Sequence, residues 1–382
     1  MAGALEGIRV VELAHIMAGP VAGMMLADLG ADVIKVEKLP GGDDTRRMQP
    51  PMVGDQSAAF LMMNRNKRGI ALDLKTEHGK EALRRLLATA DVLIENYRMG
   101  TLDKLGFGYD SVHALNPRLI YCSLSGFGRT GPYAARGGFD LVAQGMSGLM
   151  GITGEGPGRA PVKVGAPVTD ITAGILAAMG ILAALQARTR TGEGQMVDTS
   201  LFEAGIVQTY WQSAIALATG ASPGPLGSGH PLNAPYQAFA TKDGWINVGA
   251  ANQKSWLKLI ECLAAPHLAA DPRFASNADR MGNLPALVDA LTPLFAARTT
   301  AEWLDLFDRM GMPAGPVLSI QEMLADPQTR AREMVVATDH PTLGRVETLG
   351  APVKLSATPA GVTRAAPTLG QHTDEILREL GL

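Results

Sequence analysis

Cysteine is scarce in this chain, which has only Cys122 and Cys262 among its 382 residues. Two cysteines this far apart exclude a disulfide framework and a CxxC metal site. The histidines lack HExxH spacing, so the sequence predicts no metal centre. The N-terminal segment MAGALEGIRVVEL has no basic region followed by a long apolar stretch, as a signal peptide would have. We therefore expect a protein of the cytoplasm.

An excess of positive charge is also lacking, because the formal net charge is −3. Proteins that bind nucleic acids or membranes are usually basic over a whole domain, so neither partner is expected. The most apolar segment, residues 171–185, is interrupted by Gly174 and Gly180 and is short for a membrane span. It is interpreted as a buried helix. With 46% hydrophobic and 19% charged residues, the composition is that of a globular protein.

The first two hundred residues alternate short apolar runs with helical patterns. Helices are predicted at about 20–29 and 77–89. Near-continuous Val, Ile and Leu runs are typical of parallel strands that are buried on both faces. Such runs predict strands at 8–13, 32–37, 69–74, 91–95 and 119–124. The sequence therefore predicts an α/β fold with an open parallel sheet, as in Rossmann-like domains.

A second, smaller α+β domain is expected after the Gly/Pro-rich segment 221–235. TKDG at 241–244 lies between two strand-like runs and predicts a hairpin. Helical patterns follow at about 253–263, 285–296 and 300–309. The turn-rich segment MPAGPV leads back to a second hairpin and to a terminal helix at about 371–380. We predict a large domain from residues 1–220 plus 325–382, and a small domain from residues 221–324.

Two common motifs are incomplete. Glu37 ends the second predicted strand, where an acidic residue can bind a nucleotide ribose, but the preceding turn HIMAGPVAG lacks GxGxxG. A plain βαβ unit is the better interpretation. The segment from Gly145 to Leu149 resembles the GxSxG motif of serine hydrolases but lacks its last glycine. Neither dinucleotide binding nor serine hydrolysis is therefore expected.

Basic residues are candidates for binding an anionic ligand. The run NRNKR at 64–68 has two interpretations, a solvated charged surface, which is favoured, or a phosphate clamp. Lys38 and Lys75 each follow the carboxyl end of a predicted strand, which is where open α/β sheets bind ligands. These two lysines are the stronger candidates for a phosphate site.

Asp170 directly precedes a long apolar helical pattern. An aspartate in this position is typical of a helix N-cap. Backbone N–H groups and the helix dipole would also keep such a carboxylate ionised. Since an ionised carboxylate in a dry pocket can act as a nucleophile, the cap interpretation is compatible with a catalytic one.

A series of longer segments is more specific than any single motif. They are, in chain order, GIRVVELAHIMAGPVAGMMLADLGADVIKVEK, NRNKRGIALDLK, ADVLIENYRMGTLDKLGFGYD, NPRLIYCSLSGFG, GGFDLVAQGMSG, TGEGQMVDTSL, MPAGPV and APTLGQHTDEIL. In these segments the chain resembles the family III CoA-transferases, which include formyl-CoA transferase, carnitine CoA-transferase and alpha-methylacyl-CoA racemase. The resemblance implies an interlocked homodimer, in which each subunit has a Rossmann-like large domain built from both chain ends.

The resemblance also implies site residues. It places the family's nucleophilic carboxylate at Asp170 and the turn after the first strand among the contacts to CoA. The implied CoA contacts are Met17, Ala18, Lys38, Leu72, Asp73, Leu74, Lys75, Asn96, Tyr97, Arg98, Lys104, Arg136, Gly137, Gly138, Phe139 and Asp140. For Asp140, a cap of a helix starting at Leu141 and a role at the site are equally favoured. Backbone N–H groups at Gly137 and Gly138 could stabilise an oxyanion, and residues 225–230 could form a lid.

Two departures from the family pattern narrow the function. The racemases need a histidine where this chain has Phe139, and racemisation needs two acid/base groups. Formyl-CoA transferase has a glutamine where this chain has Met17, so oxalate and formate chemistry is not favoured. We expect a transferase that moves CoA from an acyl-CoA to a carboxylic acid, with no permanently bound cofactor. Succinyl-CoA and a dicarboxylate are expected by analogy; the alternatives are a racemase and a non-catalytic acyl-CoA-binding protein.

Overall fold

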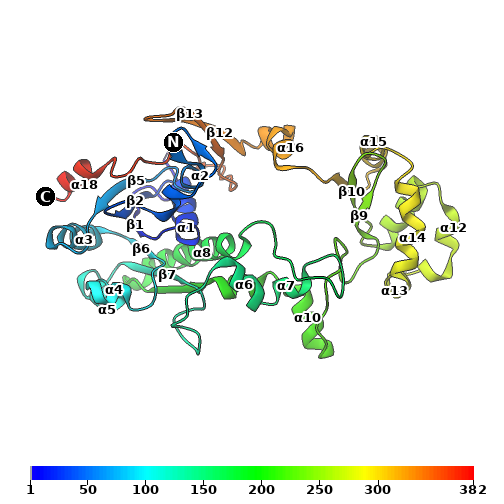
Figure 1. The fold of residues 1–382 in the computed structure, drawn as a ribbon, viewed down its shortest axis with the longest axis horizontal. Coiled ribbons are helices and arrows are strands. Elements are labelled where there is room, and N and C mark those ends of the chain that lie inside the picture. The colour runs from blue at the N-terminus through cyan, green and yellow to red at the C-terminus, as the bar shows by residue number, and fades with distance from the viewer. Residues whose placement is uncertain (1) are drawn as a thin grey trace. The chain divides into compact units, whose positions relative to one another are not determined.

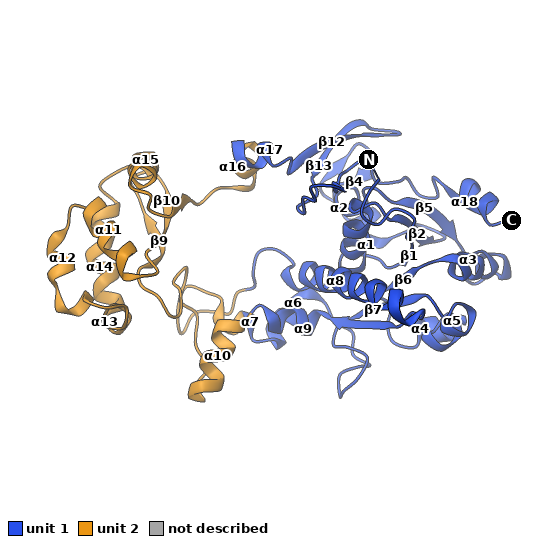
Figure 2. Cartoon of the chain, turned by 180° about the vertical axis from the view of Figure 1, so that it is seen from behind, with its two compact units in different colours: residues 1–149, 163–208, 326–382 blue, residues 150–162, 209–325 orange. Residues whose placement is uncertain are grey.

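The computed structural model describes residues 2–382 and divides into two compact units, which are coloured separately in Figure 2. Unit 1 contains residues 1–149, 163–208 and 326–382, and unit 2 contains residues 150–162 and 209–325. Like the predicted large domain, unit 1 is built from both ends of the chain. The division differs from the predicted boundaries because the first long stretch ends at 208 and residues 150–162 join the second unit.

Unit 1 is built on a six-stranded sheet with strand order β5-β2-β1-β6-β7-β8, and all its neighbouring strands are parallel (Figure 1). The strands are β1 (Arg9–Leu13), β2 (Asp32–Lys38), β5 (Arg68–Leu72), β6 (Val92–Glu95), β7 (Ile120–Ser125) and β8 (Met196–Ser200). The predicted α/β class is confirmed, and the first five strands coincide with the predicted runs. The edge strand β8 is the one that the sequence analysis missed.

Helices cover both faces of this sheet, as doubly wound folds require. One apolar core lies between the sheet and the helices α1 (Ala18–Asp28) and α8 (Val168–Thr191). The other core involves α3 (Glu77–Thr89), α5 (Tyr109–Leu115) and the C-terminal helix α18 (Thr373–Glu379). The C-terminal segment thereby completes the domain that the N-terminal strands begin.

Helix α8 approaches α1 closely because of a glycine. A Cβ atom on Gly174 would lie 2.7 Å from a methyl carbon of Val21 and 2.8 Å from the carbonyl oxygen of Ala18. Among residues 2–382, α8 is long and apolar enough by composition to cross a membrane. Its Ala173, Ala177 and Ile181 are buried in the core of unit 1, as the interpretation of a buried helix predicted.

Unit 2 contains a three-stranded antiparallel sheet with the order β11-β10-β9 and several helices. The predicted hairpin is β9 (Tyr236–Ala240) with β10 (Trp245–Gly249), and the third strand is β11 (Ala314–Pro316). The predicted helices correspond to α11 (Gln253–Cys262), α14 (Leu284–Phe295) and α15 (Thr300–Met310), and they enclose an aromatic core. The sequence thus predicted the main elements of this unit.

The remaining α-helices and strands each have ten residues or fewer. In unit 1 they are α2 (Ala58–Met63), α4 (Thr101–Leu105), α6 (Asp140–Met146), α9 (Leu201–Val207), α17 (Pro327–Ala331), the hairpin β12 (Val335–His340) with β13 (Gly344–Leu349), and β3 (Met52–Val53) with β4 (Gln56–Ser57). In unit 2 they are α10 (Tyr210–Thr219), α12 (Pro266–Ala270), α13 (Asn277–Gly282) and α16 (Ile320–Ala325). Helix α7 (Leu149–Ile152) spans the boundary between the two units.

Candidate active site

The candidate site is a cavity of about 460 Å³ in unit 1, at the carboxyl ends of the central strands. Strand β1 pairs with β2 on one side and with β6 on the other, so the strand order reverses at this point. Doubly wound sheets bind their ligands at such switch points. The lining residues are His15, Ile16, Met17, Ala18, Asn96, Tyr97, Arg98, Met99, Thr101, Leu124, Ser125, Gly126, Ala134, Ala135, Arg136, Gly137, Gly138, Phe139, Asp170 and Leu201.

Asp170 brings an unusual carboxylate to this cavity. Burial raises the pKa of Asp170 to about 6, and the negative charge of Asp140 contributes in the same direction. No side chain or backbone group among residues 2–382 donates a hydrogen bond to its carboxylate. At neutral pH most of the carboxylate is ionised but poorly solvated, which is the state that favours nucleophilic attack or proton abstraction.

The predicted cap role of Asp170 is wrong. Helix α8 begins two residues earlier, at Val168, and Pro167 occupies the N-cap position. Asp170 is therefore the third residue of the helix, with a side chain that lines the cavity. The expectation that helix N–H groups and the dipole would dominate its ionisation is also corrected, because burial raises the pKa instead.

Asp140 caps the neighbouring helix rather than its own. It is the first residue of α6, whose N-cap position is Phe139. Its Oδ1 accepts hydrogen bonds from the Thr169 backbone N–H at 3.0 Å and from Thr169 Oγ1 at 2.7 Å. Its Oδ2 accepts a hydrogen bond from Gln144 Nε2 at 2.8 Å. Asp140 thus fixes the first turn of α8 beside Asp170, and the predicted cap of a helix starting at Leu141 is wrong.

The structure brings together many of the residues that the family resemblance pointed to. Those that line the cavity with Asp170 are Met17, Ala18, Asn96, Tyr97, Arg98, Arg136, Gly137, Gly138 and Phe139. Those outside its lining are Lys38, Leu72, Asp73, Leu74, Lys75, Lys104 and Asp140. Leu72 is part of the core, whereas Lys75 and Lys104 are exposed. With Asp170, the first group comes from four separate chain segments, which the switch point brings together.

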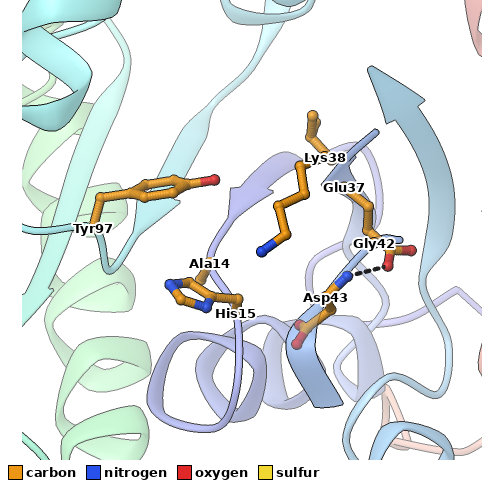
Figure 3. A pocket seen from close by; sticks show the side chains of 8 residues that line it. Ala14, His15, Glu37, Lys38, Gly42, Asp43 and Tyr97 are labelled. Atoms are coloured by element: carbon orange, nitrogen blue, oxygen red, sulfur yellow. Dashed lines mark hydrogen bonds between the residues drawn. The ribbon is translucent and has the colours of Figure 1, made fainter. Parts of the chain in front are cut away.

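Lys38 lines a separate, smaller depression next to the cavity. Figure 3 shows its side chain in the space bordered by His15, Tyr97 and Asp43. His15 and Tyr97 line both the depression and the cavity. The Lys38 ammonium forms an ion pair of 2.9 Å with Asp44, whose side chain is more than one-third exposed. An anion in the depression would therefore meet a cation that has a single acidic partner.

The candidate phosphate-binding cations include a set without ion pairs and a set with acidic partners. No ion pair is formed within residues 2–382 by Arg98 or Arg136 of the cavity, nor by the exposed Lys75 or Lys104. Arg136 instead stacks its guanidinium over the ring of Tyr133, 4.1 Å from the ring centroid. These cations remain available to an anionic ligand, which fits the predicted contacts.

The basic run at 64–68 belongs to the other set. Arg65 binds Asp28 at 2.6 Å, Lys67 binds Glu12 at 2.8 Å, and Arg68 binds Asp32 at 2.7 Å. All three basic side chains are buried. The favoured interpretation as a solvated surface is therefore wrong, and the phosphate-clamp alternative has no free cation to support it. These ion pairs link the run to α1, β1 and β2.

Sequence analysis missed His15, although its position two residues after the end of β1 was a usable signal. Burial lowers the pKa of His15, which keeps the imidazole neutral over most of the physiological range. The sequence analysis also missed Lys35, which lies fully buried between Glu12 and Asp43. A lysine within a strand gives no indication of its distant partners, so this contact could not be predicted.

Together, the open parallel sheet, the switch-point cavity, its two unpaired arginines and the Asp170 carboxylate are typical of an α/β enzyme that acts on an anionic substrate. The sequence profile described as CoA-transferase family III matches residues 5–373. The chain belongs to this family of CoA-transferases.

Relatives of known activity agree with this assignment. The chain is 42% identical to succinate–glutarate CoA-transferase of Agrobacterium fabrum, over 98% of this chain and 95% of that protein. It is 39% identical to succinyl-CoA:glutarate CoA-transferase of Mus musculus, over 98% and 86%, respectively. An acetyl-CoA:oxalate CoA-transferase of Acetobacter aceti is 41% identical over 93% and 90%.

A solved structure confirms the fold. The CAIB/BAIF family protein from Brucella suis is 42% identical, covers 100% of both chains and superposes with a TM-score of 0.88. The chain is thus an enzyme that transfers CoA between an acyl-CoA and a carboxylic acid, rather than a non-catalytic acyl-CoA-binding protein.

Proposed function

We propose that Asp170 is the nucleophile of this transferase and that CoA passes through an aspartyl-CoA thioester on its side chain. The observation that carries the proposal is the Asp170 carboxylate itself, which lines the switch-point cavity with a raised pKa and no hydrogen-bond partner within residues 2–382. A carboxylate suits this role because the enzyme-bound thioester is close in energy to the substrate and product thioesters.

The reaction has two symmetrical halves. An Asp170 oxygen attacks the carbonyl carbon of the donor thioester, the C–S bond breaks, and a mixed anhydride and CoA thiolate result. The thiolate attacks the aspartyl carbonyl, which releases the donor acid and leaves aspartyl-CoA. The acceptor carboxylate then attacks aspartyl-CoA to give a second anhydride and thiolate. The thiolate attacks its acyl carbonyl, which forms the product thioester and restores Asp170.

Each tetrahedral intermediate carries an oxyanion that needs hydrogen-bond donors. Gly137 and Gly138 are the proposed source, because both line the cavity and their N–H groups have no acceptor within residues 2–382. A Cβ atom on Gly138 would lie 2.5 Å from the Cα of Gly126, so this position requires glycine. The close backbone approach keeps side chains away from the proposed oxyanion position.

The CoA moiety is proposed to bind along the carboxyl ends of β1, β2 and β6. Support comes from the unpaired guanidinium groups of Arg98 and Arg136 and from the depression that contains Lys38. Guanidinium and ammonium groups bind phosphates by charge-assisted hydrogen bonds. The exposed Lys75 and Lys104 extend the same set of free cations.

The proposed substrates are succinyl-CoA as donor and a dicarboxylate such as glutarate as acceptor. Support comes from the relatives of Agrobacterium fabrum and Mus musculus, whose names give succinate or succinyl-CoA with glutarate. The similarly close oxalate enzyme shows that overall identity does not separate these acids. A screen of acceptor acids with succinyl-CoA and acetyl-CoA as donors distinguishes them.

An interlocked homodimer is the proposed assembly. In unit 1, Ile175, Met179 and Leu182 form an exposed apolar stripe at helical spacing along α8. In unit 2, α10 has no buried residue, and its Leu217 is 89% exposed. Apolar surface of this kind marks protein interfaces, and a second copy of this chain is the partner that the family resemblance implies.

Intact-mass spectrometry tests the proposed nucleophile. After incubation with succinyl-CoA, the protein should gain the mass of CoA minus water, and hydroxylamine should remove the adduct. The variant Asp170→Ala should gain nothing. Asp374→Ala is the matched control, because Asp374 is also an acidic residue in the first turn of a helix but is exposed on α18. An active Asp170→Ala variant, or an adduct on another peptide, would refute the proposal.

A further inference from the structure

The turn between β1 and α1 is held in a strained conformation. Ile16 has a φ of 69°, in the left-handed region that β-branched residues rarely adopt. His15, Ile16, Met17 and Ala18 of this turn all line the cavity that contains Asp170. Backbone strain of this kind persists only where surrounding contacts determine the conformation, and it is frequent at functional sites.

Side chains from two distant segments hold the backbone of this turn. Asn96, which follows β6, makes both bonds of a clamp on His15: its Oδ1 accepts from the His15 N–H at 3.0 Å, and its Nδ2 donates to the His15 carbonyl oxygen at 2.8 Å. Asp43 Oδ1 accepts from the Ile16 N–H at 3.1 Å. The backbone on both sides of the strained peptide is therefore fixed from outside the turn.

Buried charges in turn hold Asp43 and the end of β1. The Lys35 ammonium lies 2.8 Å from Asp43 and 2.9 Å from Glu12, and it donates to the Ala14 carbonyl oxygen at 2.9 Å. The Lys67 ammonium binds Glu12 and donates to the Pro20 carbonyl oxygen at 2.9 Å, in the first turn of α1. Since these ion pairs are shielded from water, they fix the position of Asp43 and of the backbone on both sides of the turn.

We propose that Asn96 is a positioning residue, whose amide sets the His15–Ala18 wall of the cavity against Asp170. The inference rests on the proposed function, because the wall matters only if the cavity is where Asp170 reacts. The Asn96 amide uses one N–H donor and its oxygen acceptor in hydrogen bonds to the His15 backbone. Small displacements of groups around a reacting centre lower the turnover rate strongly without changing the affinity for remote parts of the substrate.

The test compares Asn96→Ala with Asn116→Ala. The Asn116 amide clamps backbone in the same way: Nδ2 donates to the carbonyl oxygens of Leu87 at 3.0 Å and Ala90 at 2.9 Å, and Oδ1 accepts from the Arg118 N–H at 3.2 Å. Asn116 precedes β7 and so lies at the amino ends of the parallel strands, whereas the cavity lies at their carboxyl ends. Loss of either clamp should lower the melting temperature similarly.

Steady-state kinetics of CoA transfer then separate the roles. Asn96→Ala should lower kcat by at least about tenfold, with KM for the acyl-CoA within about threefold of wild type, whereas Asn116→Ala should keep wild-type kcat. A raised KM with unchanged kcat would overturn the proposal in favour of a CoA contact. An unchanged kcat and KM would overturn it too. Failure of the proposed function itself would be visible separately, as an absent adduct on the wild-type protein.

Discussion

At the scale of the residue, Asp170 is the group on which the proposed chemistry depends. Its position could be predicted from the sequence because a lone aspartate stands before a long apolar helix in a recognisable segment. Its ionisation could not, since the low solvation and the neighbouring charge of Asp140 arise only when α6 and α8 come together. The raised pKa makes two outcomes measurable.

The first outcome concerns the rate. With a pKa of about 6, Asp170 is protonated below that pH and cannot attack a thioester, so kcat/KM should rise with pH through about 6 and level off above it. The measurement is the pH profile of kcat/KM with succinyl-CoA. Asp140→Asn removes the nearby negative charge and should move the rise to lower pH. A profile that is flat from pH 5 to 8 would contradict the assignment.

The second outcome concerns stability. In the unfolded chain an aspartate ionises near pH 4, whereas folded Asp170 stays protonated until about pH 6. The unfolded state therefore loses its proton first, and stability falls as pH rises between these values. Asp170→Asn should abolish transfer yet stabilise the protein by about 1–3 kcal/mol at pH 7.5. Urea unfolding at pH 7.5 measures this, and a destabilised variant would count against it.

At the scale of the element, the helical and apolar patterns were sufficient to predict five strands of the large sheet and the helices α1, α3, α8, α11, α14, α15 and α18. Helix α10 and most of the short helices were not predicted. Strand β8 was missed because its sequence, MVDTS, alternates with polar residues and is only partly buried at the sheet edge. The start of α8 was misplaced because Val168 and Thr169 already adopt helical structure after Pro167. The role of the run at 64–68 depends on partners up to 311 residues away in the chain, which local pattern cannot reveal.

The burial of the basic run at 64–68 predicts that Arg65 contributes more to the stability of the protein than the exposed Arg309. Arg65 and Asp28 form an ion pair with both side chains 4% exposed, so Arg65→Ala should destabilise the protein by about 3–5 kcal/mol. KM for the acyl-CoA should stay unchanged in the folded fraction. Arg309→Ala, which removes an exposed pair with Asp305 on α15, should leave stability unaltered. Denaturant melts and Michaelis constants check both, and a raised KM for Arg65→Ala would restore the phosphate-clamp interpretation.

At the scale of the whole molecule, the two compact units each expose apolar helix surface that a single chain leaves uncovered. The resemblance in sequence pointed to an interlocked dimer, and the exposed stripe on α8 supports it. Light scattering coupled to size exclusion should give twice the 40.1 kDa chain mass for the wild type. Met179→Glu should reduce that mass or cause aggregation. A wild-type mass equal to one chain would contradict the proposed assembly.

The most direct test of the central claim follows an oxygen atom. If the acceptor carboxylate attacks aspartyl-CoA and the thiolate then opens the anhydride at the acyl carbonyl, one acceptor oxygen stays on Asp170. With oxygen-18 in the acceptor acid, the tryptic peptide of residues 164–188 should become heavier, because Asp170 is its only acidic residue. Label in this peptide after turnover is the predicted result. An unlabelled peptide, despite formation of product thioester, would contradict the account.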